Sequence, residues 1–449
     1  MLDAPLIGLY GPDDVLAWET DGPRTACEFL SDVLSLADSL PDRPTILNLL
    51  SSRYEFLVGL SAAMLRRQVT LLPQARAPQA LRVIAKDYDE SYCLTDRDEP
   101  VEGIESFTPP PRTGLAAWPR VIPRIPLSQV VAIAFTSGST GRPTPNQKTW
   151  GALVCVARAT SSRFGLKAGY RGGVVATVPH QHMFGLECSV MLPVQHGLTM
   201  HAGRPLFPED IRVMLQQVPG RSLLITTPLH LRACVTAMVK FPSVEMIVSA
   251  TSPLTRELAR EAERQFQAPV QEIFGFAEAG SVASRRTLET DEWQPLDGVE
   301  LIQDHLEWTV RSDYLSRPVR FPDRITVSEQ GTFRVLGRAE DDVNIAGHRV
   351  SLGDLNQKLL EVEGVQDGVF FLPDADEGPV TRLTAFVVAP GKTVEEIQQA
   401  LRRCIDPVFL PRPLMLVRRL PRNETGKLPR EALHALAERC RGGGSPHDI

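Results

Sequence analysis

The fold can be worked out from the stretch Val130-Val131-Ala132-Ile133-Ala134-Phe135-Thr136-Ser137-Gly138-Ser139-Thr140-Gly141-Arg142-Pro143. An apolar run that ends in small residues is typical of a buried strand followed by a tight loop. Glycines and hydroxyl residues let backbone N–H groups come close to phosphate oxygens. The stretch therefore indicates a candidate nucleotide-phosphate loop, with an ordinary Ser/Gly turn as the alternative.

Strand and helix patterns alternate on both sides of this stretch. The predicted strands are 45–50, 69–72, 92–94, 173–178, 223–226, 246–249 and 270–273, and the predicted helices are 54–67, 77–87, 149–164 and 255–266. This alternation predicts an α/β fold with mostly parallel sheets and helices on both faces. Ligands of such sheets bind at the carboxyl ends of the strands, so we expect the site near residues 136, 179, 249 and 274.

The pattern changes toward the carboxyl end of the chain. Residues 290–340 are polar and strand-like. Beyond them, Ser351 is expected to cap a helix, with Asp354 as its capping-box partner and Gly364 as its stop. We expect a large, multi-layered N-terminal domain over residues 1–338 and a small, mobile C-terminal α+β domain over residues 339–449.

Composition excludes several classes of protein. The 449 residues carry a net charge of −6 and are 43% hydrophobic, which gives no overall positive charge for nucleic acid. No apolar run approaches the roughly 20 residues that cross a bilayer. The seven cysteines are scattered without a Cys-x-x-Cys pair, which is typical of a reducing compartment. The start, Met1 to Pro5, lacks the features of a signal peptide, so we expect a cytoplasmic protein.

Several motifs between about Val130 and Leu433 resemble, in order and content, those of the adenylate-forming superfamily. This superfamily includes acyl-CoA synthetases, aryl-acid ligases and stand-alone adenylation enzymes. The motifs are Thr136 to Gly141, Pro179 to Gly185, Ser249 to Leu254, Glu272 to Gly280, Phe321 to Arg324, Gly337 to Asp342, Ile345 to Val350 and Pro421 to Lys427. Agreement of several motifs in order is far more specific than one glycine-rich loop.

The resemblance implies that ATP is bound. The phosphate loop would hold the β- and γ-phosphates, Phe274 would stack on adenine, and Asp323 would accept hydrogen bonds from both ribose hydroxyls. The implied ATP-binding residues are Thr136, Ser137, Gly138, Ser139, Thr140, Gly141, Lys148, Thr251, Ser252, Phe274, Gly275, Phe276, Ala277, Asp323 and Arg338.

The resemblance also implies roles in catalysis and acid binding. Glu278 would hold the Mg²⁺ that bridges the phosphates, and Lys427 would contact the substrate carboxylate and the α-phosphate. His182 would line the acid pocket and respond to ATP, and Arg338 would reach ribose or phosphate. The implied acid pocket consists of His182, Met183, Phe184, Ser249, Ala250 and Gly275.

His180 and His182 also allow a zinc interpretation. They lie two residues apart on a strand-to-helix turn, but no acidic or cysteine partner follows at a motif spacing. A buried core histidine is favoured over a metal ligand, and we expect no tightly held metal.

Three positions depart from the family pattern. Thr144 stands where a lysine usually follows the phosphate loop, so either Lys148 supplies that charge or backbone and hydroxyl groups hold the phosphate alone. Ala277 replaces a threonine that contacts the α-phosphate, at a cost of roughly 0.5 to 1.5 kcal/mol. Glu340 stands at the hinge, where aspartate or lysine is usual.

The implied reaction has two steps. A carboxylic acid attacks ATP to give acyl-AMP and pyrophosphate, and a thiol then attacks the acyl-AMP. Between the steps the small domain would rotate about Glu340, remove Lys427 and bring Gly347, His348 and Arg349 to line the tunnel for the pantetheine thiol.

The identity of the thiol leaves two alternatives. The sequences of residues 137–150 and 409–430 look most like stand-alone bacterial ligases of aryl-polyene and xanthomonadin-type pigment clusters. This resemblance implies an aromatic acid such as a hydroxybenzoate, transferred to an acyl carrier protein. An acyl-CoA or aryl-CoA synthetase that uses free CoA is the second alternative.

A third interpretation is a degenerate member that binds nucleotide or carrier protein without turnover. The departures at Thr144, Ala277 and Glu340 favour it. The charged residues at 278, 323, 338 and 427 are all retained and favour an enzyme.

Overall fold

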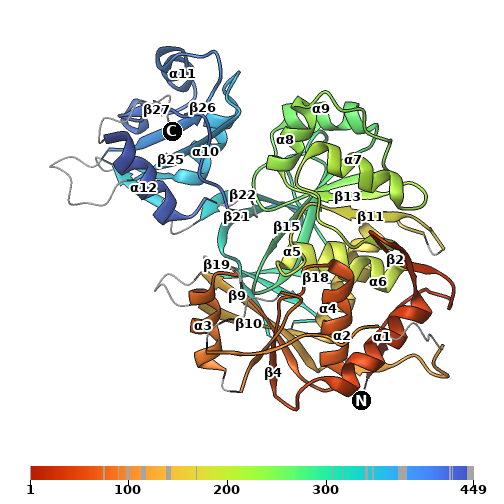
Figure 1. Cartoon of the computed structure of the whole chain (residues 1–449). Coiled ribbons are helices and arrows are strands. Elements are labelled where there is room, and N and C mark those ends of the chain that lie inside the picture. Colours follow the sequence, from red (N-terminus) through yellow and green to blue (C-terminus); the bar gives the residue numbers. More distant parts are fainter. Residues whose placement is uncertain are drawn as a thin grey trace.

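A computed structural model describes most of the chain, namely residues 2–73, 76–88, 90–97, 101, 103–112, 118–137, 143–167, 169–305, 307–315, 317–338, 342–345, 348–372, 382–423, 426 and 428–441. It has a mixed α/β fold with a large N-terminal domain and a smaller C-terminal domain (Figure 1). The predicted fold class is therefore confirmed. In the described part of the chain, no helix is long and apolar enough to cross a membrane.

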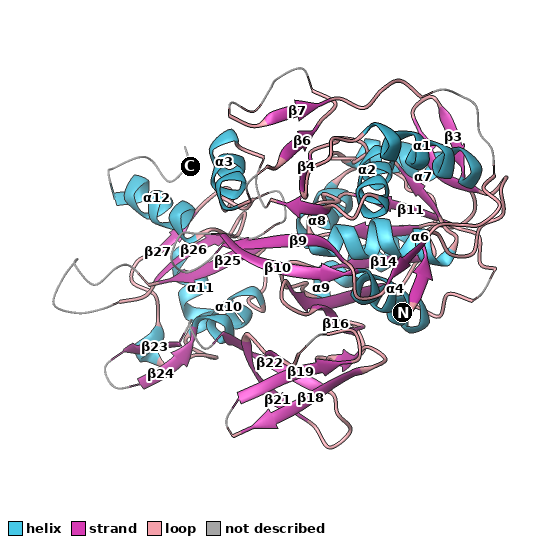
Figure 2. Ribbon diagram, turned by 90° about the horizontal axis from the view of Figure 1, so that it is seen from below, coloured by secondary structure: helices cyan, strands magenta, loops and turns pink. Residues whose placement is uncertain are grey.

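The phosphate-loop strand belongs to a six-stranded sheet with the order β10-β9-β5-β4-β6-β7. The strands are β4 (Thr45–Asn48), β5 (Val69–Leu72), β6 (Tyr92–Leu94), β7 (Glu105–Phe107), β9 (Val130–Ser137) and β10 (Pro143–Thr149). All are parallel except β10, which pairs antiparallel with β9 at the edge of the sheet (Figure 2). The residues after the loop thus return along the strand that precedes it.

A nine-stranded sheet forms the second layer, with the order β17-β16-β15-β14-β13-β11-β12-β2-β3. Its strands are β2 (Val15–Glu19), β3 (Gly22–Thr25), β11 (Gly173–Ala176), β12 (Thr199–His201), β13 (Leu223–Thr226), β14 (Met246–Ser249), β15 (Val270–Phe276), β16 (Gly280–Arg285) and β17 (Gln294–Pro295). The strands from β15 to β2 are parallel. Their carboxyl ends therefore share one edge, as the alternating pattern predicted.

Helices cover both faces of these sheets. They are α1 (Ala26–Ser39), α2 (Arg53–Leu65), α3 (Pro78–Asp87), α4 (Trp150–Arg163), α5 (Met183–Gly185), α6 (Leu192–His196), α7 (Pro208–Gln217), α8 (Pro228–Thr236) and α9 (Arg256–Phe266), with a π-helix at Leu186–Met191. One core joins α7, α8 and α9 to one face of the nine-stranded sheet, and another joins the π-helix and α6 to the opposite face. Thr149 and Thr255 cap α4 and α9 with their side chains, where the sequence predicted the helix starts.

Short antiparallel strands complete the large domain. They are β1 (Asp3–Pro5) with β8 (Arg124–Pro126), then β18 (Val299–Asp304), β19 (Glu307–Ser312) and β20 (Val319–Arg320), and then β21 (Asp323–Val327) with β22 (Phe333–Arg338). The small domain lies beside the β21–β22 hairpin (Figure 1).

The small domain has its own apolar cores. Its elements are β23 (Asp342–Ile345), β24 (His348–Ser351), α10 (Leu352–Leu360), β25 (Asp367–Phe371), β26 (Thr384–Val388), α11 (Val394–Leu401), β27 (Leu414–Leu416) and α12 (Arg430–Arg441). Ser351 caps α10 as predicted, but the predicted capping box is wrong, because Asp354 pairs with Lys358 at 2.9 Å instead. The helix ends at Leu360, before the predicted stop at Gly364.

Candidate active site

Three of the four predicted strand ends, those near 179, 249 and 274, belong to the nine-stranded sheet, whereas the one at 136 ends β9 of the six-stranded sheet. In the register of neighbouring strands, Thr226 pairs with Ser249, and Ser249 pairs with Glu272. The segments that follow these residues therefore leave the sheet side by side. They carry Thr251 and Ser252 after β14 and the turn with Glu278 after β15.

The turn with Glu278 joins β15 to β16. Its carboxylate side chain is exposed, whereas its backbone carbonyl accepts a hydrogen bond of 3.1 Å from Nζ of Lys148. Lys148 comes from β10, and the residue is only 4% exposed. An exposed carboxylate fits Mg²⁺, a cation that binds through one or two protein carboxylates together with phosphates and water.

The other side of this turn is held by Glu187, the second residue of the π-helix. Its Oε2 accepts hydrogen bonds from Ser281 N at 3.0 Å and from Ser281 Oγ at 2.5 Å. Burial raises the pKa of Glu187, and the bonds from Ser281 and the charge of Lys148 oppose that shift. Gly280 has φ +81°, and a Cβ there would lie 2.4 Å from Oε1 of Glu187. Only glycine fits at this position without movement.

Aromatic packing connects this turn to the predicted ribose site. The ring of Phe274 stacks on Phe321 at 5.5 Å between centroids with an interplanar angle of 9°. Two residues later, Asp323 begins β21 and pairs in register with Arg338 at the end of β22. The structure thus brings Phe274, Asp323 and the backbone of Arg338 into one neighbourhood, although they are far apart in the sequence.

The predicted acid pocket residues follow β11 and β14, which β13 separates in the nine-stranded sheet, and Gly275 lies on β15 beside β14. His182 precedes α5, which contains Met183 and Phe184, and its carbonyl accepts a 2.7 Å hydrogen bond from Leu186 N. Ser249 ends β14 and is followed by Ala250.

Two buried hydroxyls lie on this same segment. Among the described residues, Ser249 Oγ and Thr251 Oγ1 are buried and have no hydrogen-bond partner. Buried hydroxyls are normally paired, so these two are candidates for contact with a ligand.

His180 is a core residue. Its Nε2 lies 3.2 Å from the carbonyl of Leu50, and its ring packs on Phe56 at 4.6 Å between centroids. Burial and the charge of Arg53 lower its pKa well below the usual value. No group of three or more potential metal-ligating side chains occurs within the described ranges.

The last motif of the small domain reaches the large domain. A Cβ placed on Gly426 would lie 3.5 Å from Thr251 Oγ1 and 3.7 Å from Ser252 Oγ. The carbonyl of Gly426 accepts a hydrogen bond of 2.6 Å from Arg422 Nη1. The segment that leads into Lys427 is thus seated against the segment that follows β14.

Several predicted residues lie outside the described residues. They are Gly138, Ser139, Thr140, Gly141, Glu340, Gly347 and Lys427. The backbone of Thr136, Ser137, Arg338, His348 and Arg349 is described within strands β9, β22 and β24, but their side chains are not.

Two acidic residues near the site, Glu187 and Asp367, lie outside the sequence motifs. Glu187 was overlooked because its partners come from distant segments, and Asp367 because it pairs with Arg422, 55 residues away in the sequence. The sequence signal that bears on Glu187 is a distant one, the glycine at position 280, which leaves room for the carboxylate.

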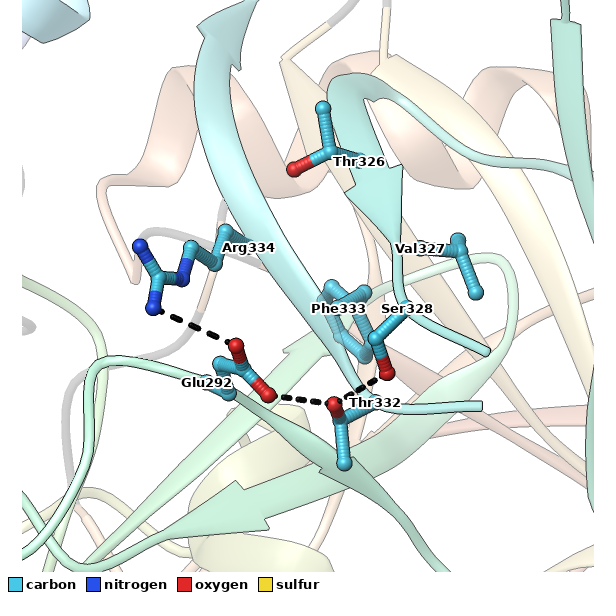
Figure 3. A pocket seen from close by; sticks show the side chains of 7 residues that line it. All are labelled: Glu292, Thr326, Val327, Ser328, Thr332, Phe333 and Arg334. Atoms are coloured by element: carbon cyan, nitrogen blue, oxygen red, sulfur yellow. Dashed lines mark hydrogen bonds and ion pairs between the residues drawn. The ribbon is translucent and has the colours of Figure 1, made fainter. Parts of the chain in front are cut away.

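A cavity of about 260 Å³ lies at the far end of the β21–β22 hairpin (Figure 3). Its polar side chains bind one another: Thr332 Oγ1 donates to Glu292 at 2.5 Å, and Arg334 pairs with Glu292 at 3.2 Å. It contains none of the predicted site residues, because Asp323 and Arg338 are at the opposite end of the hairpin. This cavity is separate from the candidate active site.

Sequence comparison identifies relatives among ligases. The family model of the AMP-binding enzymes matches residues 49–322, and that of the AMP-binding enzyme C-terminal domain matches residues 355–427. A 4-coumarate–CoA ligase of Halorhodospira halophila is 28% identical over 65% of this chain and 73% of its own length. A 3-hydroxybenzoate–CoA/4-hydroxybenzoate–CoA ligase of Thauera aromatica is 23% identical over 68% of this chain and 66% of its own.

Solved structures show the same fold. ATP-bound MatB from Rhodopseudomonas palustris superposes with a TM-score of 0.80 and 17% identity, over 96% of this chain and 97% of that one. MenE from Bacillus subtilis with ATP and magnesium ion gives 0.77 and 17%, over 94% and 97%. Enzymes of this family use ATP and Mg²⁺. The chain belongs to the AMP-binding enzyme family of the adenylate-forming superfamily.

Proposed function

We propose that this protein is an acid–thiol ligase that forms an acyl-AMP intermediate. The observation that carries the proposal is the approach of Gly426 to Thr251 and Ser252. This approach places Gly426, the residue before Lys427, beside the end of β14, where Ser249 and Thr251 have buried, unpaired hydroxyls. A cation from the small domain and a site for an acid and a nucleotide would meet there.

In the first step, a carboxylate oxygen of the acid bonds to the α-phosphorus of ATP, and the bond to pyrophosphate breaks. Lys427 stabilises the negative charge that develops on the carboxylate and the α-phosphate. Glu278 would hold Mg²⁺, which supplies positive charge to the phosphates. The contribution of the protein is orientation and electrostatics.

The nucleotide is held by residues around the β15–β16 turn and the β21–β22 hairpin. Phe274 offers a ring face for adenine, Asp323 accepts from the ribose hydroxyls, and Arg338 reaches ribose or phosphate. The loop of residues 136–141 holds the β- and γ-phosphates through backbone and hydroxyl groups.

In the second step, the small domain turns about Glu340 and withdraws Lys427. The segment of Gly347, His348 and Arg349 then guides the thiol. The sulfur bonds to the acyl carbon, the carbon–oxygen bond to AMP breaks, and the thiol proton passes to solvent. The products are a thioester and AMP.

The acid in this proposal is aromatic and resembles a hydroxybenzoate. Support comes from the named substrates of the relatives, which are coumarate and hydroxybenzoates. His182, Met183 and Phe184 on one side and Ser249, Ala250 and Gly275 on the other would enclose it.

The thiol in this proposal is the phosphopantetheine of an acyl carrier protein in the cytoplasm. The support is the resemblance of residues 137–150 and 409–430 to carrier-loading ligases of pigment clusters. Free CoA is the second candidate, and the relatives named as CoA ligases favour it.

The test has two parts. Pyrophosphate exchange into ATP is measured with a panel of aryl, fatty and amino acids, and thioester formation is then compared with free CoA and with holo carrier protein. Exchange driven by an aromatic acid and a thioester formed on the carrier protein are expected. ATP binding without exchange for any acid would instead support a degenerate binding protein.

A further inference from the structure

A basic and an acidic side chain, Lys148 and Glu187, are buried directly behind the turn that carries Glu278. Lys148 is 4% exposed and Glu187 is 3% exposed. Neither forms an ion pair within 4 Å in the described part of the chain, but each acts on the other electrostatically. Burial lowers the pKa of Lys148, and the negative charges of Glu187 and Glu278 oppose that shift.

Both residues form their hydrogen bonds with the turn itself. Lys148 Nζ donates to the carbonyl of Glu278 at 3.1 Å. Glu187 Oε2 accepts from Ser281 N at 3.0 Å, and Oε1 lies against Gly280. The turn is therefore anchored on both sides of the backbone from which the Glu278 side chain projects.

The two anchors come from regular secondary structure, β10 and the π-helix. Lys148 lies on β10 opposite Ala132 of β9, the strand that leads into the phosphate loop. Glu187 lies in a π-helix, a form that is rare and often found at functional sites. A displacement of either anchor would move the Glu278 carboxylate relative to the phosphate loop.

We propose that Lys148 and Glu187 act together as positioning residues. They fix the turn 276–281 and thereby hold the Glu278 carboxylate where it can bind the metal–ATP complex. The inference rests on the proposed function only in that Glu278 binds the metal. In this arrangement Lys148 does not replace the lysine missing at position 144. Its ammonium group donates to the Glu278 carbonyl behind the turn, and the phosphate loop binds the phosphates without it.

The charges make the two residues interdependent. Each charge acts on the other without direct contact, so removal of one leaves the other without its opposite charge, which is expected to cost more than removal of both. Lys148→Met and Glu187→Gln each keep the side-chain length, so the double variant restores charge balance. The double variant still lacks the bond to the Glu278 carbonyl.

The experiment measures Mn²⁺ and ATP binding by electron paramagnetic resonance and calorimetry, with melting temperature as the check on folding. Each single variant is expected to weaken binding of Mn²⁺ in the presence of ATP by about 5-fold or more, with metal-free ATP binding less affected. The double variant is expected to be less impaired than the product of the two single effects. Lys358→Met, in a partly exposed pair with Asp354, is the control and should change nothing.

Ser281→Ala keeps both charges and tests the same anchor if Lys148→Met does not fold. It removes the hydroxyl bond of 2.5 Å to Glu187 and should weaken Mn²⁺ binding in the same direction but less. Folded single variants with unchanged Mn²⁺ affinity would overturn the inference, as would effects that simply multiply in the double variant. Failure of the wild type to exchange pyrophosphate would refute the proposed function instead, since the binding assay needs no acid substrate.

Discussion

Arg422 is bound to Asp367 by two hydrogen bonds, from Nε to Oδ2 at 2.8 Å and from Nη2 to Oδ1 at 2.6 Å. The third nitrogen, Nη1, donates to the carbonyl of Gly426 at 2.6 Å. The carboxylate of Asp367 also acts electrostatically on Arg232 of α8, in the large domain. Strand β25 thus orients an arginine that holds the backbone immediately before Lys427.

Asp367→Asn is expected to slow pyrophosphate exchange by about 10-fold, because a charge-assisted bidentate contact contributes about 1.5 to 3 kcal/mol. Thioester formation from preformed acyl-AMP should be less affected, since Lys427 is withdrawn in that step. Asp354→Asn breaks a partly exposed pair in the same domain and is the control. Equal losses in both half-reactions would mean that Asp367 only stabilises the small domain.

Gly426→Ala is expected to reduce exchange more than it reduces stability. Gly426 has φ +80°, and the added methyl group would face Thr251 Oγ1 at 3.5 Å. Gly391→Ala is a matched control, because Gly391 has φ +79° in the same domain and open space around it. Both changes should cost about 1 to 2 kcal/mol in backbone strain. Exchange rates that fall equally in the two variants would contradict a specific role for position 426.

Gly280→Ala is expected to destabilise the protein by more than the strain of a left-handed alanine. Its Cβ would lie 2.4 Å from Oε1 of Glu187 and would displace a buried carboxylate. Gly298→Ala, at φ +79° with nothing within 4 Å, gives the strain alone. Thermal melting compares the two, and equal losses of stability would show that Glu187 moves away freely.

Ala277→Thr is expected to raise the adenylation rate. It restores the hydroxyl that the family places near the α-phosphate, and one hydrogen bond of roughly 0.5 to 1.5 kcal/mol corresponds to about 2- to 10-fold. The measurement is kcat/KM for ATP in the exchange reaction. An unchanged or lower value in a variant that melts like the wild type would argue against this contact.

Histidine burial makes stability depend on pH. Burial and the charge of Arg204 lower the pKa of His230 to about 4, whereas the unfolded chain titrates near 6.5. The unfolded state therefore binds more protons between these values, and the free energy of unfolding decreases as pH falls from about 6.5 to about 4.

His230→Gln is expected to remove up to about 3 kcal/mol of that pH-dependent loss. Buried His180 and His201, whose pKa values are also lowered by burial, keep a residual slope of the same sign. Denaturant unfolding at pH 4.5, 5.5 and 7 measures the effect. His305→Gln, at a side chain that is 96% exposed, is the control, and equal slopes in both variants would contradict the assignment.

The sequence predicted the parts of the fold that depend on local patterns. The buried strand before Thr136, the helices that begin near 149 and 255 and the mostly parallel sheets all follow from periodicity. Strand β10 was missed because Pro143 and Pro145 are typical of loops. Its place at the sheet edge tolerates prolines, since their missing N–H groups need no partner on the open side.

The candidate site was only partly predictable for a physical reason. Motifs name the residues that face a ligand, such as Glu278, because ligand chemistry restricts their type. The residues behind them are chosen by packing, and Lys148 meets Glu278 only because two sheets adjoin across 130 residues of sequence. The buried contacts of Glu187 likewise depend on the three-dimensional fold, because its partner Ser281 is 94 residues away.

The central claim is tested most directly by pyrophosphate exchange into ATP with the wild type and with Lys427→Ala. Exchange should depend on one class of aromatic acid and fall by about 100-fold or more in the variant. The Lys358→Met variant should exchange like the wild type. Exchange at the wild-type rate in Lys427→Ala would show that Lys427 does not stabilise the adenylation step.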